Sequence, residues 1–207
     1  MNPKHNPYSI VYDLEERISK WAGSKYAVAT DSGTSSIFLS LMYRKKEMGS
    51  IGEVTIPRLT YPSVPCSIIH AGGKVKFSKA TWSGVYELLP LRIIDGALRF
   101  RKGMYEGGLH VLSFHGKKLL PIGRGGMVLT DNIKARDWLR KARFDGRQPI
   151  PLQQDNFTML GWNCYLTPEQ AARGIQLFEM IRDKKLEDLD MMKQGYPSLD
   201  KFPIYQQ

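Results

Sequence analysis

Short apolar runs alternate with amphipathic helical segments along most of this chain, and this alternation restricts the fold more than any other feature of the sequence. The runs with the length and composition of buried strands are residues 26–30, 53–56, 74–77, 91–94, 109–112 and 127–129. The helical segments are residues 11–22, 37 to about 49, 64–71, 133 to about 139 and about 168–192. Residues 79–90 show no clear pattern. The alternation predicts an α/β fold with a mainly parallel sheet flanked by helices.

Capping residues mark the expected starts of two of these helices. Thr167, Pro168 and Gln170 supply an N-cap, a first-turn proline and a capping-box partner for the last helix. Thr130 and Asp131 are the expected cap of the helix before it. Residues 193–207 contain two prolines and no periodicity, which predicts an irregular tail.

The composition is that of a single folded domain. A chain of 207 residues with 42% hydrophobic and 11% aromatic residues can bury a sizeable core. No apolar run approaches the length needed to cross a bilayer, and the N-terminus lacks the apolar core of a signal peptide. Cys66 and Cys164 lack metal-ligand spacing, so neither a disulfide framework nor a metal site is expected. These features predict a cytoplasmic protein that does not bind membranes.

The net charge of +10 first suggests a nucleic-acid partner. The basic residues, however, lie in small groups at residues 44–46, 99–102, 117–118 and 140–143, without a nucleic-acid-binding signature. A basic surface that attracts anionic small molecules fits the same charge. Charge alone is therefore weak support for a nucleic-acid partner, and we expect none.

The connection from Ser113 to Gly126 joins two apolar runs and is rich in glycine and lysine. It offers a hydroxyl, an imidazole and two amines near a strand end. A lysine in such a place can attack a carbonyl carbon, although most loop lysines are solvated charges. The loop is a candidate catalytic segment, with an ordinary surface loop as the alternative.

Other polar groups follow the remaining strands. Residues 31–36 form a Ser-, Gly- and Thr-rich turn before a helix, which either binds phosphate or serves as a plain N-cap. Asp95 lies at the end of an expected strand, where it is either a ligand group or a helix cap, and Tyr61 follows another expected strand. Pyridoxal phosphate needs a helix start for its phosphate, an aromatic ring for stacking, a carboxylate for its pyridine nitrogen and a lysine for its aldehyde. The chain contains all four.

Fragments of the sequence occur in an order that resembles the DegT/DnrJ/StrS family of pyridoxal-phosphate-dependent sugar aminotransferases, of fold type I. The fragments are residues 21–28, 32–34, 56–61, 94–97, 113–126 and 161–172. Each fragment is weak by itself, and their common order along almost the whole chain carries the resemblance. It implies a fold like a reduced large domain of the fold type I transferases.

The resemblance implies catalytic roles for Lys118 and Asp95. Lys118 would bond to the aldehyde of the cofactor and carry protons, and Asp95 would pair with the pyridine nitrogen. Lys117 is the competitor of Lys118. Lys118, however, is the sixth residue counted from Ser113 and lies five before Gly123, as the family pattern requires. A histidine at this position marks the sugar dehydratases of the family, so Lys118 argues against that branch.

The remaining implied roles concern cofactor binding and assembly. Gly33 and Thr34 would hold the phosphate, with a further hydroxyl from Ser113, and Tyr61 would stack on the ring. Asn163 matches a residue that reaches the phosphate of the partner subunit. This match implies a homodimer with shared active sites.

The chain departs from the family pattern in several places. Leu98 replaces a polar residue three positions after the acid, Arg124 replaces an acidic residue, and Tyr165 replaces a frequent arginine. The bridge between residues 77 and 93 is short, and no small C-terminal domain follows the helix at about 168–192. We therefore expect a single shortened cofactor-binding domain over residues 1–207.

The implied function is transfer of an amino group from an amino acid such as glutamate to a keto-sugar nucleotide or a similar carbonyl substrate. The departures leave the cofactor-binding set intact and fall on parts that would recognise a substrate. The alternative is a non-catalytic or cofactor-binding remnant of the fold that acts as a binding protein.

Overall fold

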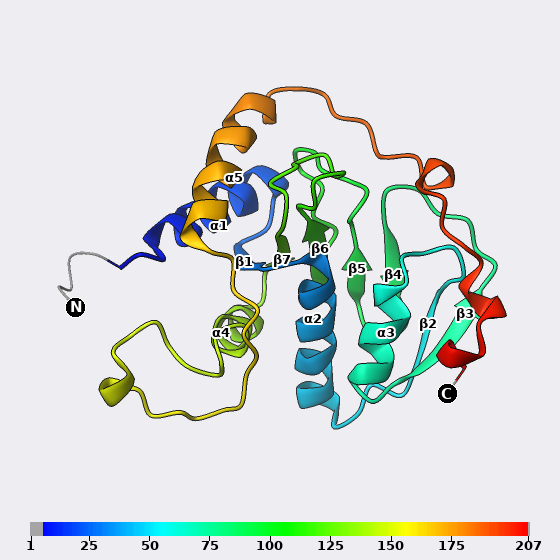
Figure 1. Cartoon of the computed structure of the whole chain (residues 1–207), viewed down its shortest axis with the longest axis horizontal. Coiled ribbons are helices and arrows are strands. Elements are labelled where there is room, and N and C mark those ends of the chain that lie inside the picture. The colour runs from blue at the N-terminus through cyan, green and yellow to red at the C-terminus, as the bar shows by residue number, and fades with distance from the viewer. Residues whose placement is uncertain (1–5, 207) are drawn as a thin grey trace.

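The computed structural model describes residues 6–206 and contains a five-stranded sheet with a separate strand pair beside it (Figure 1). The larger sheet has the order β1-β7-β6-β5-β4, and the pair consists of β2 and β3. A bridge between Thr55 and Leu89 links β2 to the residue that follows β4. The strands are β1 (Tyr26–Thr30), β2 (Glu53–Pro57), β3 (Lys74–Ser78), β4 (Tyr86–Leu88), β5 (Ile93–Asp95), β6 (Leu109–Ser113) and β7 (Gly126–Thr130).

The predicted α/β class is confirmed, but strand pairing in the sheet is mixed rather than mainly parallel. β5 and β6 are parallel, as are β2 and β3, whereas the pairs β1–β7, β6–β7 and β4–β5 are antiparallel. The connections explain this difference. Residues 114–125 join β6 to β7 and residues 89–92 join β4 to β5, in both cases without a helix. Parallel neighbours need a longer crossover, which is usually helical.

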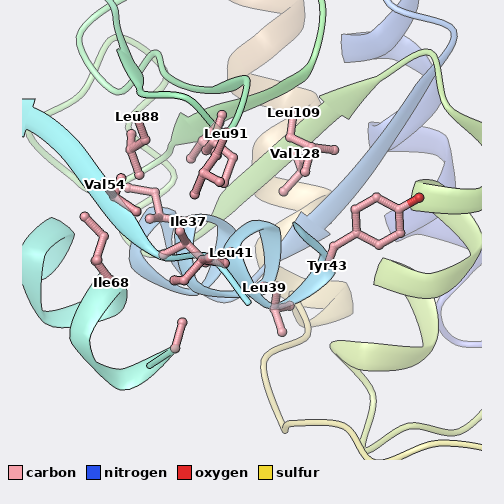
Figure 2. Close-up of a cluster of buried hydrophobic side chains, with 14 of the residues drawn as sticks. Ile37, Leu39, Leu41, Tyr43, Val54, Ile68, Leu88, Leu91, Leu109 and Val128 are labelled. Carbon is pink, nitrogen blue, oxygen red and sulfur yellow. The ribbon is translucent and has the colours of Figure 1, made fainter. Parts of the chain in front are cut away.

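Helices cover both faces of the sheet, and one core lies beneath α2, α3 and α4 (Figure 2). Leu39 of α2, Ile68 of α3 and Val128 of β7 belong to this core and are fully buried. The tight packing fixes the start of α2 against the sheet. The helices are α1 (Ser9–Ala22), α2 (Gly33–Met48), α3 (Ser63–His70), α4 (Ile133–Ala142) and α5 (Pro168–Ile181).

A second core lies on the opposite face, beneath α1 and α5. Alternate residues of β6 enter the two cores, with Leu109 and Val111 on the first face and Leu112 on the second. Burial on both faces explains why residues 109–112 of β6 are apolar except for His110. The central strand is therefore held rigidly, with Ser113 at its carboxyl end.

The start of α5 is as predicted, but its end is not. Thr167 caps the helix in a capping box with Gln170. The expected helix to about residue 192 is wrong, because α5 ends at Ile181. The following residues 182–185 are all charged, so a longer helix would have no apolar face there. The chain is held instead by an ion pair of 2.7 Å between Asp188 and Arg99.

The cap of α4 also differs from the prediction. Asn132 is the N-cap, and its side chain accepts hydrogen bonds from the amides of Lys134 (2.9 Å) and Ala135 (3.3 Å). Thr130 is still part of β7, and the carboxylate of Asp131 accepts a hydrogen bond from the amide of Lys25 (2.7 Å). Both predicted capping residues are therefore engaged elsewhere.

The segment after α5 runs across the edge of the sheet toward α3 and β3 (Figure 1). Within the described residues it contains three short 3-10 helices, η2 (Met192–Gln194), η3 (Leu199–Lys201) and η4 (Pro203–Tyr205), and no element longer than these. Leu199 is buried, and its amide donates to the carbonyl of Arg58 (2.9 Å). The segment is thus irregular, as expected, and is anchored at Leu199. No helix in residues 6–206 combines the length and apolar character of a membrane span.

Candidate active site

The start of α2 offers free backbone amides at the carboxyl edge of β1. Ser32 is the N-cap, and its hydroxyl accepts a hydrogen bond from the amide of Ser35 (3.1 Å). Ser32 therefore serves as an N-cap, as one of the two interpretations of this turn predicted. The amides of Gly33 and Thr34 lie in the first turn, where a helix provides no acceptors, so the cap leaves them available to an anion.

Ser113 lies directly against this helix start. A Cβ on Gly33 would lie 3.0 Å from the Cβ and 3.2 Å from the Oγ of Ser113. The missing side chain of Gly33 is what lets the hydroxyl of Ser113 approach the first turn of α2. Thr34 adds a second hydroxyl, which donates to Ser63 (2.9 Å). Two strand ends and one helix start thus converge at one point.

Asp95 ends β5 and is only 6% exposed. Its Oδ1 accepts a hydrogen bond from the amide of Ala97 (2.9 Å), and its Oδ2 accepts one from the hydroxyl of Tyr86 (2.8 Å). Burial raises the pKa of Asp95, while these hydrogen bonds and the charge of Lys118 act to lower it. No helix follows β5, so Asp95 is not a helix cap.

Burial distinguishes the two adjacent lysines of the loop after β6. Lys118 is half-buried, whereas Lys117 is exposed. Burial lowers the pKa of Lys118, and the nearby carboxylate of Asp95 acts in the opposite direction. Each group therefore lies close enough to the other for its charge to affect the other's pKa. Of the two lysines, Lys118 has the environment of an activated amine.

Tyr61 follows β2 and keeps 59% of its surface exposed. Its ring lies 6.4 Å from that of Tyr196, which comes from the segment after α5. Tyr196 in turn stacks on Trp82, with centroids 6.4 Å apart and planes 14° apart. Burial, with smaller effects from Asp95 and Tyr61, raises the pKa of Tyr196 to about 12. An aromatic wall of Tyr61, Trp82 and Tyr196 therefore stands beside Asp95.

Asn163 is the one predicted site residue that lies outside this cluster. It is exposed, forms a bridge with Phe144 and donates a long hydrogen bond of 3.4 Å to Asp145. Among the described residues it makes no hydrogen bond to the groups named above. The next residue, Cys164, accepts a hydrogen bond from the amide of Asp31 (2.8 Å), which keeps this segment beside the start of α2.

The structure adds site residues that the sequence did not indicate, namely Thr60, Trp82, Tyr86 and Tyr196. Tyr86 and Trp82 lie in the stretch that showed no pattern. Tyr196 lies in the predicted irregular tail. In residues 6–206 no group of three or more His, Cys, Asp or Glu side chains is arranged to hold a metal ion.

The chemistry of these groups fits pyridoxal phosphate. Two helix amides and the hydroxyls of Thr34 and Ser113 form a cradle for a phosphate, which a side chain on Gly33 would crowd. A buried carboxylate suits a positively charged ring nitrogen, and a half-buried lysine suits an aldehyde.

Comparison with known proteins points the same way. The chain matches the DegT/DnrJ/EryC1/StrS aminotransferase family model over residues 4–81 and 101–202. GDP-perosamine synthase of Caulobacter vibrioides is 21% identical over 214 residues, which are 83% of this chain and 57% of that protein. The chain thus spans little more than half of this curated relative.

Solved structures resemble the fold at low sequence identity. Helicobacter pylori PseC, an aminotransferase involved in the biosynthesis of pseudoaminic acid, matches with a TM-score of 0.70 and 15% identity, covering 94% of this chain and 78% of that one. The sugar aminotransferase CalS13 of Micromonospora echinospora matches with a TM-score of 0.69 and 17% identity, covering 82% of this chain and 60% of that one. At these identities the likeness shows a shared fold.

Proposed function

The chain belongs to the DegT/DnrJ/EryC1/StrS aminotransferase family, and we propose that it is a pyridoxal-phosphate-dependent aminotransferase. The observation that carries the proposal is that the charges of Lys118 and Asp95 affect each other's pKa, while Ser113, at the end of the strand beside β5, lies against the start of α2. When bound, pyridoxal phosphate supplies an aldehyde that accepts an amino group and a ring that accepts electrons. The chain's own residues bind it and move the protons.

The helix start and its hydroxyls bind the phosphate in this proposal. The amides of Gly33 and Thr34 point along the helix axis, where the helix dipole favours an anion. The hydroxyl of Ser113 adds a donor, and that of Thr34 adds another when it turns from Ser63 to the phosphate. These contacts orient the cofactor without taking part in the chemistry.

Asp95 and Tyr61 hold the ring. The carboxylate of Asp95 has two donors and keeps lone pairs for a protonated ring nitrogen. The exposed face of Tyr61 is available for stacking.

Lys118 is the nucleophile and proton carrier. Its lowered pKa increases the fraction of neutral amine at neutral pH, and a neutral amine attacks a carbonyl carbon or takes up a proton. Lys117 is exposed and has no such role.

The substrates and the assembly are part of the same proposal. The donor is an amino acid such as glutamate, and the acceptor is a keto-sugar nucleotide or a similar carbonyl compound. The name of the relative GDP-perosamine synthase supports a nucleotide-linked sugar. Asn163 is exposed and stands outside the chain's own cluster, which supports contact with the phosphate in a partner's site and hence a homodimer. We place the enzyme in the cytoplasm.

The test is cofactor attachment in the wild type and in Lys118→Ala, with Lys117→Ala as the matched control. The wild type and Lys117→Ala are expected to give a visible absorption band with pyridoxal phosphate. Borohydride should fix the cofactor to the peptide that contains Lys118. Absence of the band in the wild type, or an equal band in Lys118→Ala, would refute the proposal.

A second measurement separates the enzyme from the non-catalytic binding protein. Glutamate and other amino acids are added to the loaded protein, and the band of the bound cofactor is followed. Conversion to the amine form of the cofactor supports aminotransfer. A stable band with every donor supports the binding protein instead.

A further inference from the structure

Three buried side chains form a chain of hydrogen bonds behind the proposed cofactor site. The hydroxyls of Thr60 and Tyr86 are 2.6 Å apart, and the hydroxyl of Tyr86 is 2.8 Å from Oδ2 of Asp95. Thr60 is 0% exposed, Tyr86 8% and Asp95 6%. Bulk water therefore does not compete for these hydrogen bonds, and each of them matters more than it would on the surface.

The direction of these hydrogen bonds follows from the number of protons that each group can donate. An ionised carboxylate only accepts hydrogen bonds, so Tyr86 donates its single phenolic proton to Asp95. Tyr86 must then accept from Thr60. Burial first, and the charge of Asp95 second, raise the pKa of Tyr86 well above its ordinary value. Tyr86 thus remains a donor throughout the pH range in which an enzyme works.

Neighbouring groups fix the ring of Tyr86 in place. Tyr86 stands directly opposite Asp95 in the antiparallel pair of β4 and β5. Trp82 packs edge-on against the ring of Tyr86, with ring centroids 4.7 Å apart. The Nε1 of Trp82 donates a hydrogen bond to the carbonyl of Leu59 (2.8 Å). The phenol therefore has little freedom to leave the carboxylate.

We propose that Tyr86 is a positioning residue for the cofactor and acts through Asp95, an inference that rests on the proposed function. Burial alone favours the neutral acid, which would not pair with a positively charged ring nitrogen. Donation by Tyr86 favours the carboxylate and aims it. The position three residues after the acid is the buried Leu98, so the polar support comes from the neighbouring strand instead.

The test uses Tyr86→Phe, which removes one oxygen and keeps the ring. Tyr105→Phe is the matched control, because its hydroxyl likewise makes two hydrogen bonds, but only to the backbone, at 3.2 Å to Gly108 and 3.0 Å to Asp131. The titration of Asp95 is followed by carbon NMR of labelled aspartate in the cofactor-free protein, with Asp95→Asn for assignment. Affinity for pyridoxal phosphate is measured separately by absorbance.

Tyr86→Phe is expected to raise the pKa of Asp95 and to weaken cofactor binding by about tenfold, the effect of one hydrogen bond to a charged group. Tyr105→Phe should change neither quantity. An unchanged Asp95 titration, or an unchanged affinity, in Tyr86→Phe would overturn the inference. A shifted Asp95 titration in a protein whose wild type does not bind pyridoxal phosphate would refute the proposed function and leave the coupling of Tyr86 to Asp95 supported.

Discussion

Protonation of a single buried histidine is expected to dominate the loss of stability in mild acid. His110 lies in β6 and is 0% exposed, and neither ring nitrogen has a hydrogen-bond partner in residues 6–206. Its Nε2 lies only 2.4 Å from where a Cβ on Gly96 would be, so the ring is tightly enclosed. Burial, with a smaller effect from the charge of Arg99, lowers the pKa of His110 to about 4.

The sign and size of the effect follow from proton linkage. The unfolded chain protonates His110 near its ordinary pKa of 6.5, whereas the folded protein stays neutral there until about pH 4. Between these values the unfolded state binds more protons, so stability is complete above pH 6.5 and is lost as the pH falls toward 4. At 1.36 kcal/mol per pH unit, the loss from His110 is about 2 kcal/mol between pH 7.5 and pH 5. Its limit below pH 4 is about 3 kcal/mol.

Urea unfolding of the wild type and His110→Leu at pH 7.5 and pH 5 measures this contribution. The exposed His70 provides the control variant His70→Leu. The wild type and His70→Leu should lose about 2 kcal/mol more on acidification than His110→Leu, because other titrating groups are common to all three. Equal losses in the wild type and His110→Leu would mean that the folded protein accommodates the charged imidazole, and the reasoning from burial would be wrong.

Three further predictions concern the candidate site and its support. The rate of cofactor attachment, followed by stopped-flow absorbance, should rise with pH and reach half its maximum below pH 10.5, because burial lowers the pKa of Lys118. A midpoint at or above pH 10.5 would contradict this prediction. Gly33→Ala should weaken binding of pyridoxal phosphate by about tenfold, because its methyl group displaces the Ser113 hydroxyl, while an unchanged affinity would show that this hydroxyl is not a ligand. Glu15→Gln should lower the free energy of unfolding, measured in urea, by about 3–5 kcal/mol, because the buried guanidinium of Arg143 loses its counter-charge. A loss below about 1 kcal/mol would mean that the guanidinium is solvated in the folded protein.

Local patterns in the sequence were sufficient to predict most of the elements. The apolar run at 109–112 becomes the central strand β6, and the Ser- and Gly-rich turn becomes the capped start of α2. Strands that run the same way in one sheet end at the same edge, which is why Ser113 and Asp95 lie at one edge although they are distant in sequence. The family pattern separated Lys118 from Lys117, and burial makes the same distinction.

Features that depend on pairing between distant segments could not be read from local pattern. β4 is three residues long and is defined by its hydrogen bonds to β5, so the sequence of residues 79–90 carries no period. The antiparallel β4–β5 pair follows from a four-residue connection, and this reversal was not predicted. The path of the chain after α5 likewise depends on the ion pair between Asp188 and Arg99, which are distant in the sequence.

Leu98 shows why the spacing of residues along the sequence does not reveal every contact of the site. It replaces a polar residue of the family pattern, so the sequence alone suggests that one polar contact to the cofactor is lost. In the structure the Leu98 side chain is buried, and its carbonyl accepts the amide of Leu189 (2.8 Å), which helps to anchor the segment that carries Tyr196. The donor to Asp95 comes from Tyr86, which is close in space because β4 pairs with β5. The position after the acid thus serves packing, and the neighbouring strand supplies the hydrogen bond.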